Sequence, residues 1–287
     1  MQLVSKGLEH DQSFRTTMSS KVFRKLSEFI NAYCGIKMPP EKKILLESRL
    51  NKRLRHLNMK SYEEYCDFLF SETGKRQELI HMIDVVTTNK TDFFREAMHF
   101  DFIRDHIFPQ YKETKINKIS IWSAGCSTGE EVYTTCMVLE ELREYWPGID
   151  YSVTGSDICS QVLEKAALAV YPEERTMIIP LAIKRKYFLK SKSTTDKTVR
   201  IIPELRGKTN FIRLNFMDES FDLPNNFDII FCRNVLIYFD NRTQENVIKK
   251  LCAKLKIGGF LFIGHSESLT NMDLPLIQVK PTVFRKI

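Results

Sequence analysis

Apolar residues in roughly the first 85 positions recur at the three- and four-residue spacing of amphipathic helices. This spacing predicts four helices: one between Ser20 and Gly35, one that opens after Pro40, one from Ser61 to Phe70, and one around 74–84. Ser61 and Glu64 form a capping-box pattern at the start of the third helix. The second helix carries an apolar stripe that we expect to be buried, made of Leu46, Leu50, Leu54 and Leu57. The N-terminal part is therefore predicted to be a small helical bundle.

From residue 118 onward, short apolar strands alternate with helices. Strands are expected at 118–123, 151–156, 227–232, 260–264, 274–279 and 282–286. Helices are expected at 129–145, 158–169 and 242–256, the last one closed by Gly258-Gly259. Such alternation is typical of an α/β protein, with a parallel sheet covered by helices on both faces. The stretch 185–212 interrupts it, and β-prone pieces at 198–202 and 210–214 predict a small inserted sheet.

Composition narrows the class of protein. The 287 residues, 43% hydrophobic and 28% charged, suffice for one large domain or for a full domain with a small one. No apolar run approaches the length of about 20 residues that a membrane helix needs, and residues 1–20 lack the apolar centre of a signal peptide. The seven cysteines are scattered without a C-x-x-C pair, as expected of free thiols in a reducing compartment. We therefore expect a cytoplasmic protein with no membrane insertion.

The net charge of +7 is concentrated in one segment. Residues 21–60 hold 11 Lys and Arg against 3 Asp and Glu, whereas the rest of the chain is nearly neutral. Basic side chains of the second helix are expected to form an outward face, which includes Arg49, Lys52, Arg53 and His56. Such a face favours docking of an acidic partner, and the alternative is an ordinary solvated surface.

The first expected strand of the α/β part runs into a glycine-containing loop, Ser123–Glu131. Gly125 and Gly129 allow a tight turn, and the following helix directs free N–H groups toward a ligand. The loop is neither G-x-G-x-x-G nor a Walker loop. Asp157 ends the next strand, where an acid can accept both ribose hydroxyls, although it could instead cap the next helix. Loop and acid together favour an adenosine-containing cofactor.

Two acids, Glu130 and Glu131, follow the loop directly. Carboxylates repel a pyrophosphate but suit a cation, so they favour S-adenosylmethionine, with its sulfonium and ammonium groups, over NAD. The alternative is that both acids simply stabilise the first turn of a helix through its dipole.

Several blocks of the chain resemble the CheR family of chemotaxis receptor methyltransferases. The most diagnostic blocks are Thr88-Asn89-Lys90-Thr91-Asp92-Phe93-Phe94-Arg95 and Cys232-Arg233-Asn234-Val235-Leu236-Ile237-Tyr238-Phe239; the others include Ser123–Glu131, Gly155–Ile158, Leu214–Phe216 and Gly264–Glu267. The resemblance implies a helical domain at 15–88 that carries the basic docking helix. It also implies a class I SAM-dependent methyltransferase domain at 89–287, with a Rossmann-like seven-stranded sheet and an inserted β-subdomain at about 180–213.

The resemblance also implies roles for individual residues. Cofactor binding is expected of Asn89, Thr91, Arg95, Glu130, Asp157, Asn215, Phe216, Arg233 and Asn234. Within this set Asp157 would bind the ribose, Asn215 and Phe216 would flank the adenine, and Arg233 and Asn234 would lie by the methionine. Arg95 and Tyr238 are the expected catalytic residues, although Tyr238 could be only a packed aromatic. Phe93 and Phe94 are expected in the core, Cys232 as an inert thiol, and His265 as a structural residue.

The implied reaction transfers a methyl group from S-adenosyl-L-methionine to glutamate carboxylates of methyl-accepting chemotaxis receptors, leaving S-adenosyl-L-homocysteine. A carboxylate is already ionised at neutral pH, so no general base and no metal are expected. The expected partners are acidic cytoplasmic helices of receptors, with no nucleic acid, and the enzyme is expected to be a monomer. Two alternatives remain: a nucleic-acid methyltransferase whose basic helix meets phosphates, and a non-catalytic docking module. The stretch 191–195 lacks a glycine found in members that bind a receptor C-terminal peptide, which leaves such tethering open.

Overall fold

The computed structural model describes residues 16–114, 116–193 and 195–287. Most of residues 1–20, which lack the pattern of a signal peptide, and residue 15, the expected start of the helical domain, lie outside the described residues. The chain divides into two compact units. The described part of the first unit is 16–29 and 38–86, and the second unit comprises 30–37 with 87–287. The division after residue 86 falls close to the expected boundary at 88. The segment 30–37, expected in the helical domain, belongs to the second unit.

The first unit is helical, as its apolar spacing predicts. Its described elements are α1 (Ser20–Cys34, whose last turn belongs to the second unit), η1 (Pro40–Lys42), α2 (Lys43–His56), α3 (Tyr62–Phe70), α4 (Glu72–Gln77) and α5 (Leu79–Val86). The Ser61 hydroxyl accepts the N–H of Glu64 at 3.1 Å, which confirms the predicted cap of α3. The Glu64 carboxylate returns to the N–H of Lys60, one residue before the cap. The expected fourth helix is split into α4 and α5.

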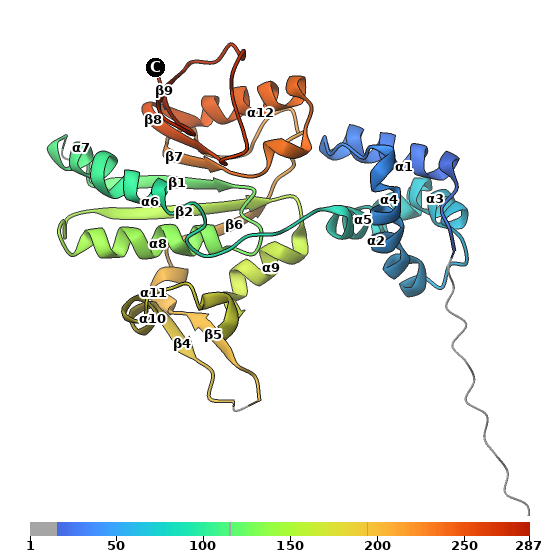
Figure 1. Ribbon diagram of the computed structural model, residues 1–287, viewed down its shortest axis with the longest axis horizontal. Coiled ribbons are helices and arrows are strands. Elements are labelled where there is room, and N and C mark those ends of the chain that lie inside the picture. The colour runs from blue at the N-terminus through green and yellow to red at the C-terminus, as the bar shows by residue number, and fades with distance from the viewer. Residues whose placement is uncertain (1–15, 115, 194) are drawn as a thin grey trace, which may run out of the picture. The chain divides into compact units, whose positions relative to one another are not determined.

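A seven-stranded sheet forms the centre of the second unit (Figure 1). Its order is β6-β2-β1-β7-β8-β10-β9, in which β6, β2, β1, β7 and β8 are parallel to one another and β10 is antiparallel to both β8 and β9. The strands are β1 (Lys118–Ala124), β2 (Asp150–Asp157), β6 (Thr209–Arg213), β7 (Phe227–Cys232), β8 (Leu255–Ile263), β9 (Leu276–Lys280) and β10 (Val283–Lys286). The predicted class I methyltransferase architecture is confirmed.

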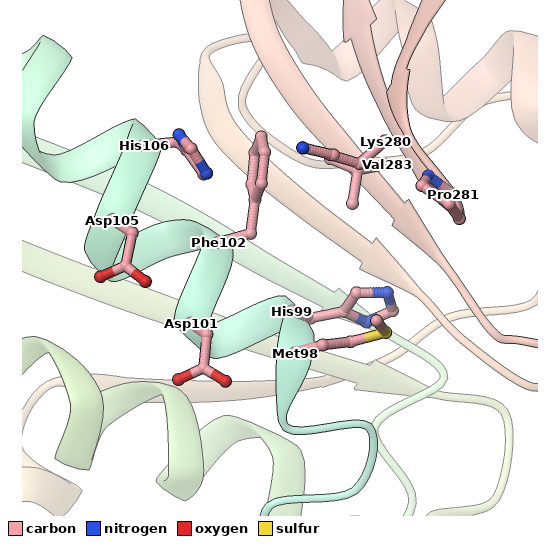
Figure 2. A pocket seen from close by; sticks show the side chains of 9 residues that line it. All are labelled: Met98, His99, Asp101, Phe102, Asp105, His106, Lys280, Pro281 and Val283. Atoms are coloured by element: carbon pink, nitrogen blue, oxygen red, sulfur yellow. The ribbon is translucent and has the colours of Figure 1, made fainter.

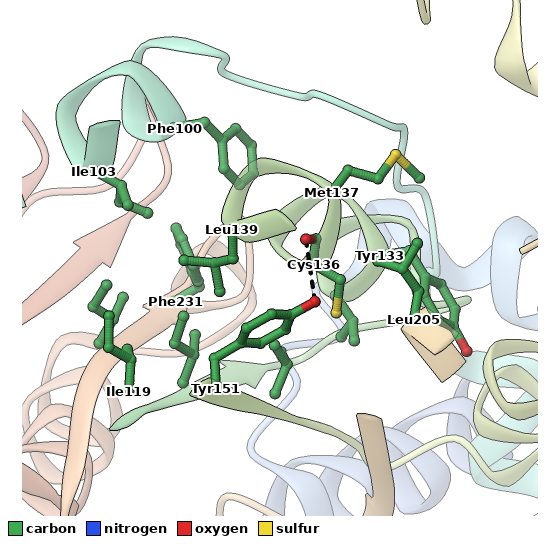
Figure 3. Packing of buried hydrophobic residues seen from close by; sticks show 14 of the residues in the cluster. Phe100, Ile103, Ile119, Tyr133, Cys136, Met137, Leu139, Tyr151, Leu205 and Phe231 are labelled. Atoms are coloured by element: carbon green, nitrogen blue, oxygen red, sulfur yellow. Dashed lines mark hydrogen bonds between the residues drawn. The ribbon is translucent and has the colours of Figure 1, made fainter. Parts of the chain in front are cut away.

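The two faces of the sheet hold separate hydrophobic clusters, because alternate strand residues point to opposite sides. Phe231 and Phe262 pack in one cluster with α8 (Glu130–Arg143), part of which is drawn in Figure 3. Ile230 and Leu261 pack in the other with α12 (Asn241–Lys254). The Tyr151 hydroxyl donates to the Cys136 carbonyl at 3.3 Å, which joins β2 to α8. Both faces are therefore covered by helices, as expected, and the carboxyl ends of the parallel strands meet at one edge.

The inserted sheet differs from its predicted bounds. Its three antiparallel strands have the order β3-β5-β4 and run over Val170–Pro172, Thr198–Ile201 and Phe188–Lys190. The prediction that 210–214 belongs to it is wrong, because β6 pairs with β2 in the main sheet. The insertion therefore spans 170–201 and not 180–213. The β-prone stretch 209–213 carries no signal for a partner more than 50 positions earlier in the chain.

Several further elements were not predicted. The helical run α6 (Met98–Phe102), η2 (Ile103–Ile107, a π-helix) and α7 (Phe108–Glu113) precedes β1. Within the insertion lie η3 (Glu173–Thr176) and α10 (Leu181–Tyr187), and α11 (Pro203–Arg206) follows it. Gly258-Gly259 does not close a helix: β8 already begins at Leu255, and Gly258 has φ +78° at an irregularity in the strand. Within the described residues, no helix is long and apolar enough to cross a membrane.

Candidate cofactor and acceptor site

The loop after β1 has a backbone that depends on its glycines. Gly125 and Gly129 have φ +87° and +91°, in the left-handed region that glycine adopts without strain. A Cβ atom on Gly125 would lie 2.4 Å from Val235, so a side chain has no room there. The N–H groups of Gly125 and Cys126 both donate to the Ser156 carbonyl at 2.8 Å. The loop is thereby held against the end of β2, and Glu130 opens α8 directly after it.

Asp157 lies at the end of β2 and fastens two neighbouring segments. Its carboxylate accepts the N–H of Ser127 at 2.9 Å and the N–H of Cys159 at 3.0 Å. The N-cap residue of α9 (Ser160–Leu168) is Cys159, and no side chain caps this helix, so the alternative interpretation of Asp157 as a helix cap is wrong. The bond to Ser127 orders the loop.

Glu130 is buried and has two polar partners. The Thr128 hydroxyl donates to it at 2.5 Å, and Nη2 of Arg175 lies 2.9 Å from Oε1. Arg175, from η3, also donates to the Thr91 carbonyl and lies 3.5 Å from Asp92. Burial raises the pKa of Glu130, while the hydrogen bonds and the Arg175 charge oppose that rise.

Arg175 was not predicted as a residue of this site. It follows Glu130 by 45 positions, in a stretch whose elements were not predicted. No spacing or composition signal points to it, because only the fold of the insertion brings η3 to the first turn of α8.

Arg233 lies buried at the end of β7 between two carboxylates. Its Nε is 3.3 Å from Glu96 and its Nη1 is 3.5 Å from Glu131, while Nη2 donates to the Arg95 carbonyl. Burial raises the pKa of Glu131, although Arg233 and the Ser123 hydroxyl oppose this. Burial also acts to raise the pKa of Glu96, but there Arg233 and the neighbouring histidines prevail, and the pKa is lowered. Arg233 is therefore the cation that pairs with two partly buried acids.

A third buried acid, Glu267, shapes the turn after β7. It accepts the N–H groups of Asn234 at 2.9 Å, Leu236 at 2.7 Å and Gly264 at 2.6 Å. Asn234 itself is in the left-handed region with φ 58°. A carboxylate that binds three backbone donors stabilises this irregular turn. Gly264–Glu267 matched the family pattern, but its structural role was not predicted.

The segment 89–95 lies against the loop after β1. The Asn89 carbonyl accepts the Ser127 hydroxyl at 2.8 Å, and the Asn89 side chain reaches Thr87 and the Cys159 sulfur. Thr91 is buried. Arg95 is half-buried, and its guanidinium donates to the Lys90 carbonyl at 3.1 Å. Asn89 and Thr91 are thus brought to the same loop as Asp157 and Glu130.

The remaining predicted residues gather near the last turn of α1 within the second unit. Asn215 donates to the Tyr33 carbonyl at 2.7 Å, and the Lys37 N–H donates to the Tyr238 carbonyl at 3.0 Å. Phe216 is 9% exposed and packs edge-on against Phe221 and Phe239. Tyr238 is half-buried at the end of η4 (Leu236–Tyr238). The segment 30–37 therefore contacts the expected adenine and acceptor regions.

Known protein families include one that matches nearly the whole chain. Residues 21–87 match the family description "CheR methyltransferase, all-alpha domain", and residues 89–284 match "CheR methyltransferase, SAM binding domain". The chain belongs to the CheR methyltransferase family. It is thus a SAM-dependent methyltransferase, and the predicted family, enzyme class and cofactor are confirmed.

Curated relatives agree with this assignment. A chemotaxis protein methyltransferase of Borreliella burgdorferi is 40% identical over 258 residues, which cover 88% of this chain and 89% of the relative. One from Escherichia coli is 35% identical, covering 90% of this chain and 88% of the relative. Among solved structures, the glycopeptide N-methyltransferase MtfA complexed with sinefungin has a TM-score of 0.35 at 13% identity, covers 69% of this chain and 60% of its own, and adds nothing to the assignment.

Within this CheR-family chain, the structure corrects the expected basic face of α2. Arg53 does not lie outward: its guanidinium binds Glu78 through two hydrogen bonds of 2.7 and 2.6 Å, with side-chain exposures of 12% and 2%. The Tyr65 hydroxyl donates to the same carboxylate. Arg49 is half-buried and donates to the Val86 carbonyl. The apolar stripe is confirmed for Leu46, Leu50 and Leu54, whereas Leu57 is only half-buried.

The exposed basic residues of α2 are Lys52, Arg55 and His56. The helix period alone did not separate them from Arg53, because Glu78, its buried counter-ion, lies 25 positions further along the chain. The docking role of this helix stays a prediction.

Four further residues were interpreted from the sequence. Cys232 is fully buried, and burial raises the pKa of its thiol well above the usual value, as expected of an inert thiol. Phe93 is in the core as predicted, and Phe94 packs against it partly exposed. His265 is half-exposed, and its ring lies beside Glu96 and His99. This last placement was not predicted.

Proposed function

We propose that this CheR-family enzyme methylates glutamate side chains in the cytoplasmic domains of methyl-accepting chemotaxis receptors, as part of chemotaxis adaptation. The CheR family methylates chemoreceptor glutamates with SAM. The observation that carries the proposal is the family match over both 21–87 and 89–284, which includes the helical domain as well as the cofactor domain. We place the protein in the cytoplasm as a monomer that binds no nucleic acid.

The residues at the edge of the sheet fit the cofactor in their donor chemistry. Glu130 and Asp157 are nearly buried acids on neighbouring elements, suited to an ammonium group and to ribose hydroxyls respectively. Asn215 and Phe216 offer an amide and an aromatic face for the adenine. Arg233 and Asn234 at the end of β7, with Asn89 and Thr91 at the loop, complete the proposed binding set. S-adenosylmethionine supplies the electrophilic methyl group, and S-adenosylhomocysteine is released.

The acceptor needs no deprotonation. A glutamate carboxylate of the receptor is ionised at neutral pH, so one of its oxygens forms the new C–O bond with its own electron pair. The sulfur–carbon bond breaks, and its electron pair remains on sulfur. Alignment of the reactants provides the acceleration, and well-oriented reactants can lower a barrier by about 7–11 kcal/mol.

Arg95 and Tyr238 are the proposed catalytic residues. Arg95 would orient the carboxylate, and Tyr238 would donate a hydrogen bond to it. A tight bidentate arginine contact would slow transfer, because the carboxylate loses its charge in the transition state. The Arg95 guanidinium already donates to the Lys90 carbonyl, which leaves a weaker, partial contact for the acceptor.

Receptor docking is assigned to the exposed basic residues of α2, Lys52, Arg55 and His56, with an acidic receptor helix as partner. Half-exposed Arg49 lies on the same helix. Arg53 is left out of this set, because its charge is paired with Glu78. Opposite charges would steer the receptor helix to α2 and increase the rate of association.

The test is methyl transfer to purified receptor cytoplasmic fragments from cofactor carrying a labelled methyl group. Glutamate methyl esters hydrolyse in base, so we expect the label to be released as methanol. A receptor fragment with its methylatable glutamates changed to alanine is the control. Label that resists base, or that appears on RNA and not on the receptor, would overturn the proposal.

A further inference from the structure

Three potential metal ligands meet at one point on the second unit, outside the residues assigned to the cofactor. Glu96 precedes α6, His99 lies in α6, and His265 follows β8. Oε2 of Glu96 is 3.6 Å from Nδ1 of His99 and 3.9 Å from Nε2 of His265. The three ligand atoms all lie within 4.8 Å of one another. In a tetrahedral zinc site with bonds of about 2.1 Å, ligand atoms are separated by roughly 3.4 Å, so small side-chain shifts would bring these three into place.

The surroundings of His99 favour the tautomer with its proton on Nε2. The Thr282 hydroxyl donates to the Pro281 carbonyl at 2.6 Å. It can therefore only accept from Nε2 of His99, which lies 2.8 Å away. In the neutral ring, Nδ1 then has no hydrogen and presents its lone pair.

That lone pair has no hydrogen-bond partner although it is buried. The His99 side chain is 1% exposed, and neither Nδ1 of His99 nor Oε2 of Glu96 makes a hydrogen bond. A lone pair that faces a carboxylate oxygen is unfavourable unless a cation lies between them. A metal ion resolves this conflict and also engages His265.

The surroundings match those of metal sites. Metal-bound histidines usually hold their second nitrogen in a hydrogen bond, as Thr282 does for His99. Glu96 also has Arg233 at 3.3 Å, but a carboxylate has about four acceptor sites and can serve both cations. Nε2 of His265 now rests 3.0 Å from the sulfur of Met98, a contact that coordination would replace.

A pocket adjoins the cluster and offers an entry path. It has a volume of about 220 Å³ and lies between the helical run from Met98 to His106 and the β9–β10 hairpin (Figure 2). His99 and Met98 lie at one end of the side chains drawn there, and the carboxylates of Asp101 and Asp105 also line the pocket. Lys280 lines the pocket as well, and Arg104 pairs with both aspartates, so the pocket provides access for an ion but no strong negative charge.

We propose that Glu96, His99 and His265 bind one divalent transition-metal ion of the zinc type. Two imidazoles and one carboxylate are a ligand set that zinc accepts, with a fourth position open to water. Glu96 pairs with Arg233, which we assign to the cofactor, so the test measures metal occupancy directly and does not depend on enzyme turnover.

The test uses the full-length protein, stripped of metal with a chelator and then titrated with Co²⁺, whose visible absorption reports tetrahedral ligands. We expect one Co²⁺ to bind and one equivalent of Zn²⁺ to displace it. His265→Ala changes an exposed side chain, so it should fold normally and lower the affinity at least tenfold. His106→Ala removes an exposed histidine that lines the pocket but lies outside the cluster, and it serves as the control with unchanged affinity.

A second measurement addresses the buried ligand. Zn²⁺ should shift the NMR signal of Nδ1 of His99 and leave that of Nε2 nearly in place. Thr282→Val, which removes only the supporting hydroxyl, should weaken binding by about tenfold or more. The proposal is overturned if the wild-type protein binds no stoichiometric metal, if His106→Ala weakens binding as much as His265→Ala does, or if Nδ1 of His99 carries a proton in the presence of excess Zn²⁺.

Discussion

Nη2 of Arg175 lies 2.9 Å from Oε1 of Glu130, which joins the inserted segment to the first turn of α8. The Glu130 side chain is 2% exposed, whereas that of Arg175 is 37% exposed. The same guanidinium donates to the Thr91 carbonyl. One arginine therefore holds two of the residues that we assign to the cofactor, and it does so from outside the nucleotide-binding loop.

Replacing Arg175 is expected to weaken cofactor binding in a pH-dependent way. The pKa of Glu130 is already raised by burial, and Arg175 opposes that rise. In Arg175→Met the pKa should rise further, so the carboxylate takes up a proton at a higher pH and loses its attraction for an ammonium group. Affinity for S-adenosylhomocysteine should fall by about tenfold at neutral pH, equivalent to about 1.4 kcal/mol. Calorimetry across acidic, neutral and basic pH measures this, and the loss should be smallest in base.

Arg185→Met is the matched control, because Arg185 is an exposed arginine of α10 in the same insertion. It should leave both affinity and pH profile unchanged. A pH-independent loss in Arg175→Met would mean that Arg175 only supports the fold of the insertion.

Asp157→Ala should reduce affinity for the cofactor and loosen the loop after β1. The carboxylate accepts N–H groups of Ser127 and Cys159, and the proposed ribose contacts come in addition. Hydrogen bonds to a charged group are each worth about 1.5–3 kcal/mol. Calorimetry and thermal unfolding, measured on the same samples, separate the two effects. If the melting temperature falls and the affinity stays the same, Asp157 serves only to hold the backbone of the loop.

Arg95→Ala and Tyr238→Phe should slow transfer more than they weaken cofactor binding. Both side chains are assigned to the acceptor, so their loss acts on the transition state. We expect kcat to fall by at least tenfold, while the Kd of S-adenosylhomocysteine changes by less than about threefold. Single-turnover methylation with saturating receptor fragment measures the chemical step. Full activity in Tyr238→Phe would make Tyr238 a packed aromatic residue without a catalytic role.

His99 should make the folded state sensitive to acid. Burial and the Arg233 charge lower its pKa from 6.5 to about 4, against the weaker opposing effect of Glu96, while His265 lowers it further. The unfolded chain therefore binds this proton first as the pH falls. The stability contribution is complete above pH 6.5 and is lost between pH 6.5 and about 4.

The shift corresponds to a few kcal/mol at most, at about 1.4 kcal/mol for each pH unit. Urea unfolding at several pH values, with a chelator present to exclude metal, measures it. His99→Gln should flatten the dependence in this range, whereas His106→Gln, at an exposed position, should not. An equal slope in wild type and His99→Gln would show that other groups control acid stability.

The sequence predicts best those features whose signal is local. The strand 227–232 is apolar except for Asp228 and is found as β7 at those same residues. The cap at Ser61 and the core position of Phe93 likewise follow from neighbouring residues or from a matched motif. Contacts across the chain have no such signal. From the sequence, Arg53 is predicted to lie on an exposed basic face, because its partner Glu78 becomes its neighbour only in the folded chain. Similarly, the edge strand β6 is predicted to belong to the insertion, whereas in the fold it pairs with β2.

Arg53 should act on stability and not on receptor binding. Arg53→Met removes the counter-ion of Glu78, whose side chain is 2% exposed, and leaves a buried carboxylate unpaired. Such a loss costs about 3–5 kcal/mol. Replacing both partners together, Arg53→Met with Glu78→Gln, should recover part of it. Urea unfolding of the single and double variants measures the effect. If Arg53→Met is as stable as wild type and only the KM for the receptor rises, Arg53 belongs to the docking surface after all.

Lys52 and Arg55 allow the opposite test on the same helix, since both are exposed. Lys52→Glu with Arg55→Glu should raise the KM for receptor fragments by about tenfold. Exposed charge pairs contribute about 0.2–1 kcal/mol each, and the charge reversal turns attraction into repulsion. Stability and cofactor affinity should stay unchanged. Salt should raise the KM of the wild type, since screening shortens to about 8 Å at physiological ionic strength, and should lower that of the variant. Charge reversal of Lys249 and Lys254 on α12 leaves the net charge of the protein equal to that of the α2 variant and is the control. If the control variant shows the same rise, the receptor responds to net charge alone, and α2 is no docking surface.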